Sequence, residues 1–231
     1  MDIIPVIDLK GGVVVHARRG ERENYRALVT PFAAHPEPLA VVDGLLAYRD
    51  FTQLYIADLD AIAGRASHAE AVRDIAVRYP HLRVWLDAGL GATSQLAALP
   101  DLPNVDYVLG SESMPTLAAY HALCASLTAS RRVLSLDRGS QGELLGCSEL
   151  FDNATLWPTR VIHMTLARVG SGGGPDFDGL AELRARAPHC AVYAAGGVRD
   201  EADLHALAAQ DVAGALVATA LHDGRITPAR L

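Results

Sequence analysis

Short apolar runs recur along the chain and alternate with segments of helical spacing. The runs are nearly continuous instead of alternating between apolar and polar, which is typical of parallel strands covered on both faces. Eight such runs lie at 3–7, 54–57, 82–86, 105–109, 133–136, 161–164, 191–194 and 215–217, and a small extra strand is expected at 13–16. Helices are expected at 39–48, 68–78, 116–127, 178–187 and 201–208, and a long polar loop from 17 to about 38.

The second half of the chain repeats the first at an almost fixed distance. Gly89 and Gly196 each follow an apolar run and lie 196 − 89 = 107 positions apart, and Gly110 and Ala218 lie 218 − 110 = 108 apart. Four strand–helix units, doubled, give eight, and eight parallel strands close into a barrel. The fold class expected is therefore α/β: a single (β/α)8 TIM barrel over residues 1–231, built from two similar half-barrels. Only ten residues follow Leu221, so the closing C-terminal segment must be short.

Composition narrows the classes of function. The 231 residues are half apolar, which suffices for one large core, and the net charge of −7 argues against nucleic-acid binding. Three scattered cysteines without a CxxC pair, and no signal peptide, indicate a cytoplasmic protein. No apolar run is long enough to span a membrane, and no residue pattern calls for a metal or another cofactor.

Glycine-rich loops after the strands predict phosphate binding at the barrel mouth. Glycine lets backbone N–H groups approach a ligand, and the loops after strands seven and eight often hold phosphate in this fold. The alternative is that the glycines only permit tight turns. The residues expected to bind phosphate are Gly174, Gly196, Gly197, Ala218 and Thr219 in the second half, and Gly89, Gly91, Gly110 and Ser111 in the first.

Asp8 and Asp137 end the first and fifth strands, which face each other across an eight-stranded barrel. Two carboxylates so placed can divide the work of a general base and a general acid, if burial keeps one protonated near neutrality. The alternative is that each accepts backbone hydrogen bonds at a strand end. Exposed, unperturbed carboxyls would favour binding alone, and one desolvated carboxyl beside one ionised carboxyl would favour catalysis.

Other polar residues near the strand ends leave several roles open. Asp58 either orients the first loop, binds a ligand hydroxyl or holds a metal, the last being the weakest option. Arg19 belongs to a basic loop that either clamps an anionic ligand or is solvated. Lys10 is either solvated or paired with Asp8. A structural role is favoured for His16 and His163.

Several motifs together resemble the barrel family of histidine biosynthesis, which contains ProFAR isomerase (HisA) and the cyclase subunit of imidazole glycerol phosphate synthase (HisF). They are the stretches 4–12 (IPVIDLKGG), 57–60 (ADLD), 135–137 (SLD), 174–175 (GP) and 195–198 (AGGV). The resemblance implies a (β/α)8 barrel, two phosphate sites, and Asp8 with Asp137 as the catalytic pair. In the isomerase an acid opens an aminoaldose furanose to a Schiff base, and a base removes the C2 proton to give an aminoketose.

The chain departs from the isomerase pattern at specificity positions. Val169 stands where the isomerase has an acidic residue, and a stacking Trp is missing around Cys147 and Ser148. The chain looks closer to a divergent, archaeal-type branch of the family. The first hypothesis is a HisA-like isomerase of a phosphorylated sugar or aminosugar, distinct from ProFAR isomerase. The alternatives are a non-catalytic phosphate-ligand-binding or scaffold protein, and an enzyme of one-carbon cofactor biosynthesis (methanopterin or methanofuran type), which would need a reactive lysine. The sequence leaves the oligomeric state open.

Overall fold

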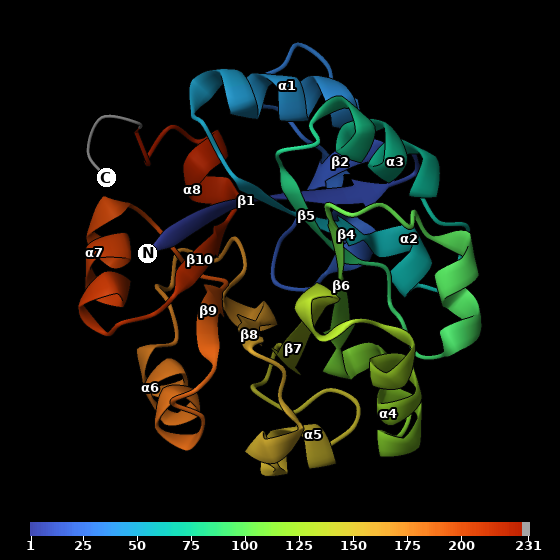
Figure 1. Cartoon of the computed structure of the whole chain (residues 1–231). Coiled ribbons are helices and arrows are strands. Elements are labelled where there is room, and N and C mark those ends of the chain that lie inside the picture. The colour runs from blue at the N-terminus through green and yellow to red at the C-terminus, as the bar shows by residue number, and fades with distance from the viewer. Residues whose placement is uncertain (228–231) are drawn as a thin grey trace.

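A closed ring of eight parallel strands forms the centre of the computed structural model, which describes residues 1–227 (Figure 1). The pairing of β10 with β1 closes the ring, with Asp2 opposite Gly214. The eight strands are β1 (Asp2–Lys10), β4 (Gln53–Asp58), β5 (Arg83–Asp87), β6 (Val105–Gly110), β7 (Arg132–Arg138), β8 (Arg160–Thr165), β9 (Ala191–Ala195) and β10 (Gly214–Val217). All eight predicted strands are confirmed, and β1 runs three residues beyond its expected end.

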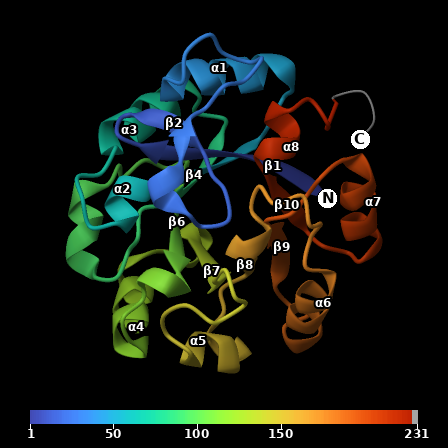
Figure 2. The same cartoon turned by 180° about the vertical axis from the view of Figure 1, so that it is seen from behind.

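Helices surround the strand ring on its outside (Figures 1 and 2). The longer ones are α1 (Pro38–Tyr48), α3 (Ala69–Arg78), α4 (Leu117–Ser126), α6 (Phe177–Arg186) and α7 (Glu201–Ala209), and the short ones are α2 (Leu59–Ile62), α5 (Glu149–Asp152) and α8 (Thr219–His222). A 3-10 helix, Thr93–Ala98, replaces an α-helix between β5 and β6. The short closing segment predicted from the sequence is α8 and the few residues that follow it.

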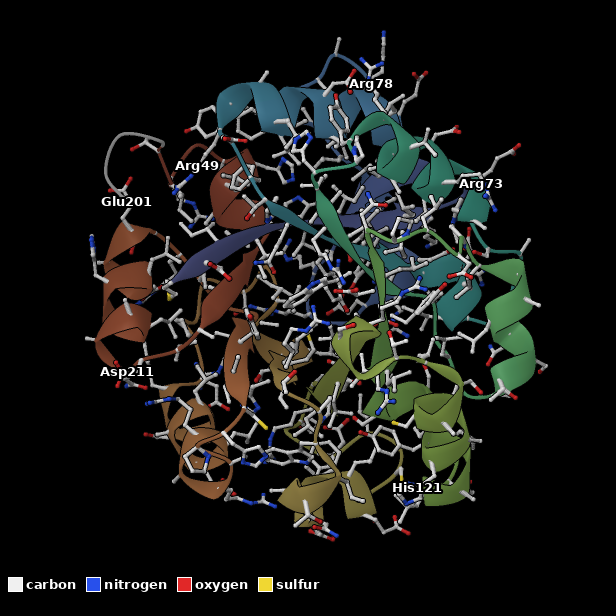
Figure 3. The ribbon with its side chains drawn as sticks, viewed as in Figure 1. Arg49, Arg73, Arg78, His121, Glu201 and Asp211 are labelled. Carbon is white, nitrogen blue, oxygen red and sulfur yellow. The ribbon has the colours of Figure 1, made fainter. Side chains whose placement is uncertain are left out.

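The outer surface of the helical layer carries exposed charges. Arg73, Arg78 and Asp211 lie at the rim of the molecule, pointing away from the strands (Figure 3). None of the helices described is long and apolar enough to cross a membrane.

Two apolar clusters fill the space inside and outside the ring. The inner cluster holds Tyr55, Trp85 and Tyr193, and the rings of Trp85 and Tyr193 meet edge to face with centroids 4.8 Å apart. The larger outer cluster packs the strands against the helices. A barrel interior filled by side chains leaves its chemistry to the loops at the strand ends.

The amino end of the barrel is closed by a buried ionic group. Asp106, fully buried at the start of β6, accepts hydrogen bonds from Arg83 Nη2 and Arg160 Nη1, each at 2.6 Å. The guanidinium of Arg160 also lies 5.4 Å from the ring centroid of Trp85. Two arginines therefore neutralise a carboxylate that would otherwise be costly to bury.

The first loop folds back over the carboxyl end of β1. The predicted small strand is present as β2 (Val13–His16), paired antiparallel with β1, and β3 (Arg26–Ala27) pairs with β2. In Figure 2 this blue segment lies in front of the barrel strands. Lys10 Nζ donates to the carbonyl of Arg22 at 2.6 Å and so holds the loop in place. The sequence had left two options for Lys10, a solvated side chain or a pair with Asp8. The structure shows neither, because Lys10 bonds the backbone of the first loop.

Candidate active site

A cavity of about 130 Å³ opens at the carboxyl ends of the strands. Asp8, Asp87 and Tyr55 line one part of it, and glycines of the β8 and β9 loops with Arg168 line another. One part of the lining therefore carries carboxyl groups, and the other carries glycine backbone and the guanidinium of Arg168. Such a division suits a ligand whose two ends differ in charge.

Asp8 is buried at the end of β1 with its carboxyl facing the cavity. Burial raises the pKa of Asp8 to about 7, the guanidinium of Arg22 lowers it, and the neighbouring Asp87 raises it. A carboxyl with a pKa near neutrality exchanges protons readily at cellular pH. The structure thus gives Asp8 the surroundings expected of an acid–base group.

Asp87, at the end of β5, is a cavity residue that sequence reasoning did not single out. Its Oδ2 accepts a hydrogen bond from the Tyr55 hydroxyl at 2.9 Å, and its Oδ1 accepts one from the Gly89 amide at 3.2 Å. Burial, with a smaller contribution from the charge of Glu112, raises the pKa of Asp87 to about 6. The signal was available, because Asp87 ends an apolar run as Asp8 does.

Asp137, at the end of β7, lies beside Asp87 and does not line the cavity. A methyl group placed on Gly110 would lie 3.2 Å from Asp137 Oδ2 and 3.9 Å from Asp87 Oδ2, so the two carboxyls flank this glycine. Asp137 Oδ1 accepts from Ser135 Oγ at 2.5 Å, and Oδ2 accepts from the Glu112 amide at 3.1 Å. Burial raises the pKa of Asp137 to about 7.

An ion pair between Arg22 and Glu112 joins the first loop to the end of β6. Arg22 lines the cavity and lowers the pKa of Asp8 and Asp87, whereas Glu112 raises the pKa of Asp87 and Asp137. The basic loop therefore contributes Arg22 to the site. Arg19, the loop residue expected to contact the ligand, lines a separate and more open depression of about 720 Å³ with Gly139 and Glu143.

Four of the five second-half residues expected to bind phosphate line the cavity. Gly196 and Gly197 have φ angles of 97° and 91°, and Ala218 and Thr219 also face the cavity. Within residues 1–227, the amides of Gly197 and Val198 donate to no other residue. Gly174 does not line the cavity, although its carbonyl lies against Gly197, where a methyl group would come within 2.1 Å of it.

The first-half loops are arranged differently. The Gly91 and Ala92 amides both donate to Gln95 Oε1 at 2.8 Å, and the Gly89 amide donates to Asp87. None of the four first-half residues expected to bind phosphate lines the cavity. Gly110 instead passes between two carboxyls, and the fully buried Ser111 bonds Asp137. The structure therefore brings the two predicted phosphate sites to the same end of the barrel but presents only one to the cavity.

Three roles were left open for Asp58: to orient a loop, to bind a ligand hydroxyl or to hold a metal. Its contacts support the first, the loop-orienting role. It is fully buried and accepts hydrogen bonds from the Ala61 amide, the Ser67 hydroxyl and the His68 amide and ring. A carboxylate surrounded in this way has no face toward a ligand, so its expected place among the substrate-binding residues is wrong. Its neighbour Asp60 accepts from the Gly11 amide at 2.7 Å and anchors the first loop.

The two histidines near strand ends differ from each other. His163 is buried and its Nε2 bonds Asp176 Oδ2 at 2.8 Å, so its structural role is supported. His16 is exposed and its Nε2 bonds Thr219 Oγ1 at 3.0 Å. His16 therefore bonds a residue that lines the cavity, and the structural role expected for it stays a prediction. Residues 1–227 hold no group of three His, Cys, Asp or Glu side chains placed to bind a metal.

The fold and the site define a (β/α)8 barrel with buried carboxyls and glycine-rich loops at its carboxyl mouth. The family model described as histidine biosynthesis protein matches residues 2–227, and the chain belongs to this family. It is thus a member of the histidine-biosynthesis barrel family, as the motifs indicated.

Relatives match over nearly their whole length. The chain is 31% identical over 248 residues to the 1-(5-phosphoribosyl)-5-((5-phosphoribosylamino)methylideneamino)imidazole-4-carboxamide isomerase (ProFAR isomerase) of Acidiphilium cryptum, covering 99% of this chain and 95% of the relative. It is likewise 31% identical to the isomerase of that name from Anaeromyxobacter dehalogenans, with 98% and 95% covered. An uncharacterized protein of Methanocaldococcus jannaschii is 25% identical, with 97% and 94% covered.

Proposed function

We propose that the protein is an isomerase of the aldose–ketose type that acts by acid–base chemistry on a phosphorylated sugar or aminosugar other than ProFAR. The observation that carries the proposal is the desolvated carboxyl of Asp8 on the cavity, at the mouth of a barrel whose open amides lie at Gly197 and Val198. The second desolvated carboxyl, Asp137, lies beside the cavity residue Asp87. Both relatives named above as isomerases act on a phosphoribosyl compound, which agrees with this class of substrate.

The reaction needs one proton donor and one proton acceptor. An acid protonates the ring oxygen of the aminoaldose, so that the ring opens to a Schiff base, and a base then removes the C2 proton and gives the aminoketose. Asp8 is the base and Asp137 the acid, or the two roles are exchanged. Because burial raises the pKa of both groups to about 7, either one can be protonated while the other is ionised near neutrality.

The cavity favours chemistry over binding alone. A binding protein would be expected to leave the two carboxyls exposed and unperturbed, whereas Asp8 and Asp137 are 8% and 5% exposed. The expectation of one desolvated and one ionised carboxyl is met only in part, because both are desolvated. An enzyme of one-carbon cofactor synthesis would need a reactive lysine, and Lys10, the only lysine of the chain, is held by Arg22 outside the cavity.

Two substitutions test the mechanism. Asp8→Asn and Asp137→Asn should each lower turnover of phosphorylated aldoses and aminoaldoses by about 10²–10⁴-fold, the usual contribution of a general acid or base. Asp74→Asn, an exposed change on α3, is the matched control and should leave turnover unchanged. Full turnover in both site variants would rule the mechanism out.

A complementation experiment tests the distinction from ProFAR isomerase. We expect the chain to fail to restore growth without histidine in a strain that lacks the isomerase. Val169, where an acid is expected, lies against Gly196 at the mouth, with its Cγ2 3.4 Å from the position a methyl group would take there. Restored growth would make ProFAR the substrate and would overturn this part of the proposal.

A further inference from the structure

We infer that the substrate carries a single phosphate and, at its opposite end, a protonated amine that Asp87 binds in place of a second phosphate. This inference rests on the proposed function and specifies the substrate class for the same site. It assigns the two ends of the cavity different ligand groups, although the two halves of the chain repeat the same strand–loop pattern.

Matched positions of the repeat show the difference directly. Gly91 corresponds to Val198 (198 − 91 = 107) and Glu112 corresponds to Ala220 (220 − 112 = 108). The Gly91 amide donates to Gln95 Oε1 and the Glu112 amide donates to Asp137 Oδ2. Within residues 1–227 the Val198 and Ala220 amides donate to no residue. At these two matched pairs the first half has therefore filled with its own side chains the donors that the second half leaves open.

A third matched pair, Ser111 and Thr219 (219 − 111 = 108), shows the same contrast in its side chains. Ser111 Oγ accepts from the Asp137 amide at 2.8 Å and donates to its carboxyl, so this hydroxyl is fully used. Within residues 1–227 the hydroxyl of Thr219, the matched residue, bonds only the exposed ring of His16, and Thr219 faces the cavity. A phosphate entering the first half would have to break the bonds that hold Asp137.

The charge around the first-half loops also excludes a second phosphate. Asp8, Asp87, Asp137 and Glu112 surround this end, and the one cation among them, Arg22, is already paired with Glu112. A phosphate dianion here would meet carboxylates in a poorly solvated place, where like charges repel most strongly. A cation in the same place would neutralise them.

Asp87 is the carboxyl best placed to receive that cation. It lines the cavity, whereas Asp137 does not, and its two oxygens each accept one hydrogen bond, from Tyr55 and Gly89. A carboxylate offers about four lone-pair sites, so both oxygens can still accept from an ammonium group. Asp8 lines the same part of the cavity and is left free for proton transfer.

Two pairs of sugar phosphates test the inference by titration calorimetry at pH 7, where the amine of the aminosugar is protonated and Asp87 is ionised. Glucosamine 6-phosphate and glucose 6-phosphate differ only in an amine, and fructose 6-phosphate and fructose 1,6-bisphosphate differ only in a second phosphate. We expect the aminosugar to bind at least about tenfold more tightly than glucose 6-phosphate, as a desolvated charge pair requires. The bisphosphate should bind no more tightly than fructose 6-phosphate.

Two variants assign the effect to residues. Asp87→Asn should abolish the preference for the aminosugar and leave competition by inorganic phosphate unchanged, because the phosphate end is untouched. Gln95→Ala should by itself leave the bisphosphate no tighter, because the carboxyls remain. Circular dichroism confirms that each variant is folded, and Asp74→Asn is the control.

Three outcomes would overturn the inference: a bisphosphate that binds tighter than its monophosphate, no preference for the amine, or a preference that survives Asp87→Asn. Failure of all four sugars to bind while inorganic phosphate binds would overturn it as well. Binding is measured without turnover, so the preference can hold even if Asp8→Asn shows that no isomerase chemistry occurs, and the two proposals fail separately.

Discussion

The hydroxyl of Tyr55 donates to Asp87 Oδ2 at 2.9 Å across the adjacent strands β4 and β5. Both side chains point into the barrel, so the bond connects the apolar interior to the floor of the cavity. It lowers the pKa of Asp87 against the larger effect of burial, which raises it to about 6. Two buried carboxyls, Asp8 and Asp87, thus line this floor, and their ionisation is coupled to folding.

Asp87→Asn should stabilise the protein at alkaline pH. The pKa of Asp87 is raised on folding, so its stabilising effect is complete below the unfolded value, about 3.9, and is lost as pH rises through about 6. The stability of the variant relative to wild type should therefore increase between pH 5 and pH 8. At pH 8 the variant should be more stable by on the order of 1 kcal/mol. Urea unfolding at both pH values measures this, with Asp74→Asn, an exposed change on α3, as the control.

Arg22→Gln should move the pH profile of activity. The guanidinium of Arg22 lowers the pKa of Asp8, so its removal should raise that pKa above about 7. If Asp8 is the base, the acid limb of kcat/KM shifts to higher pH, because a higher pH is then needed to ionise it. Arg22→Lys keeps the charge and should shift the limb less. An unmoved limb in Arg22→Gln would show that Asp8 does not set it.

Asp106→Asn should be strongly destabilising. The substitution leaves Arg83 and Arg160 facing a fully buried neutral group, and breaking such a group costs about 3 kcal/mol. Asp101→Asn is the control, because Asp101 is exposed and its ion pair with Arg131 is worth about 0–1 kcal/mol. The free energy of urea unfolding compares the two, and equal losses would contradict the role of Asp106.

Gly197→Ala should damage both folding and phosphate binding. The new methyl group would lie 2.1 Å from the Gly174 carbonyl, at a φ of 91°. Gly172→Ala also has a positive φ, 73°, but meets nothing within 4 Å, so it should cost only about 1–2 kcal/mol of conformational strain. Thermal unfolding with and without inorganic phosphate separates them: the phosphate-induced rise in Tm should be lost in Gly197→Ala and kept in Gly172→Ala.

The sequence predicted the strands and the second-half loops well, because buried parallel strands are continuous apolar runs and glycines mark the turns after them. It placed Asp8 correctly at the cavity. It could not show that Lys10 bonds the backbone at Arg22, since that contact depends on how a long loop folds back. Nor could it show that Gln95 fills the amide of Gly91, because a polar residue in a short 3-10 helix has no distinctive spacing.

The repeat gives the molecule an internal reference. Positions at the ends of β5 and β6 have counterparts at the ends of β9 and β10 in the same chain, so a substitution at one can be taken from the other. Asp87 is matched by Ala194 in the second half (194 − 87 = 107). Replacing Asp87 by Ala therefore tests which ligand the acidic end binds when it carries the residue of the second half. Few proteins let the specificity of one site be rewritten with residues that the same chain already uses.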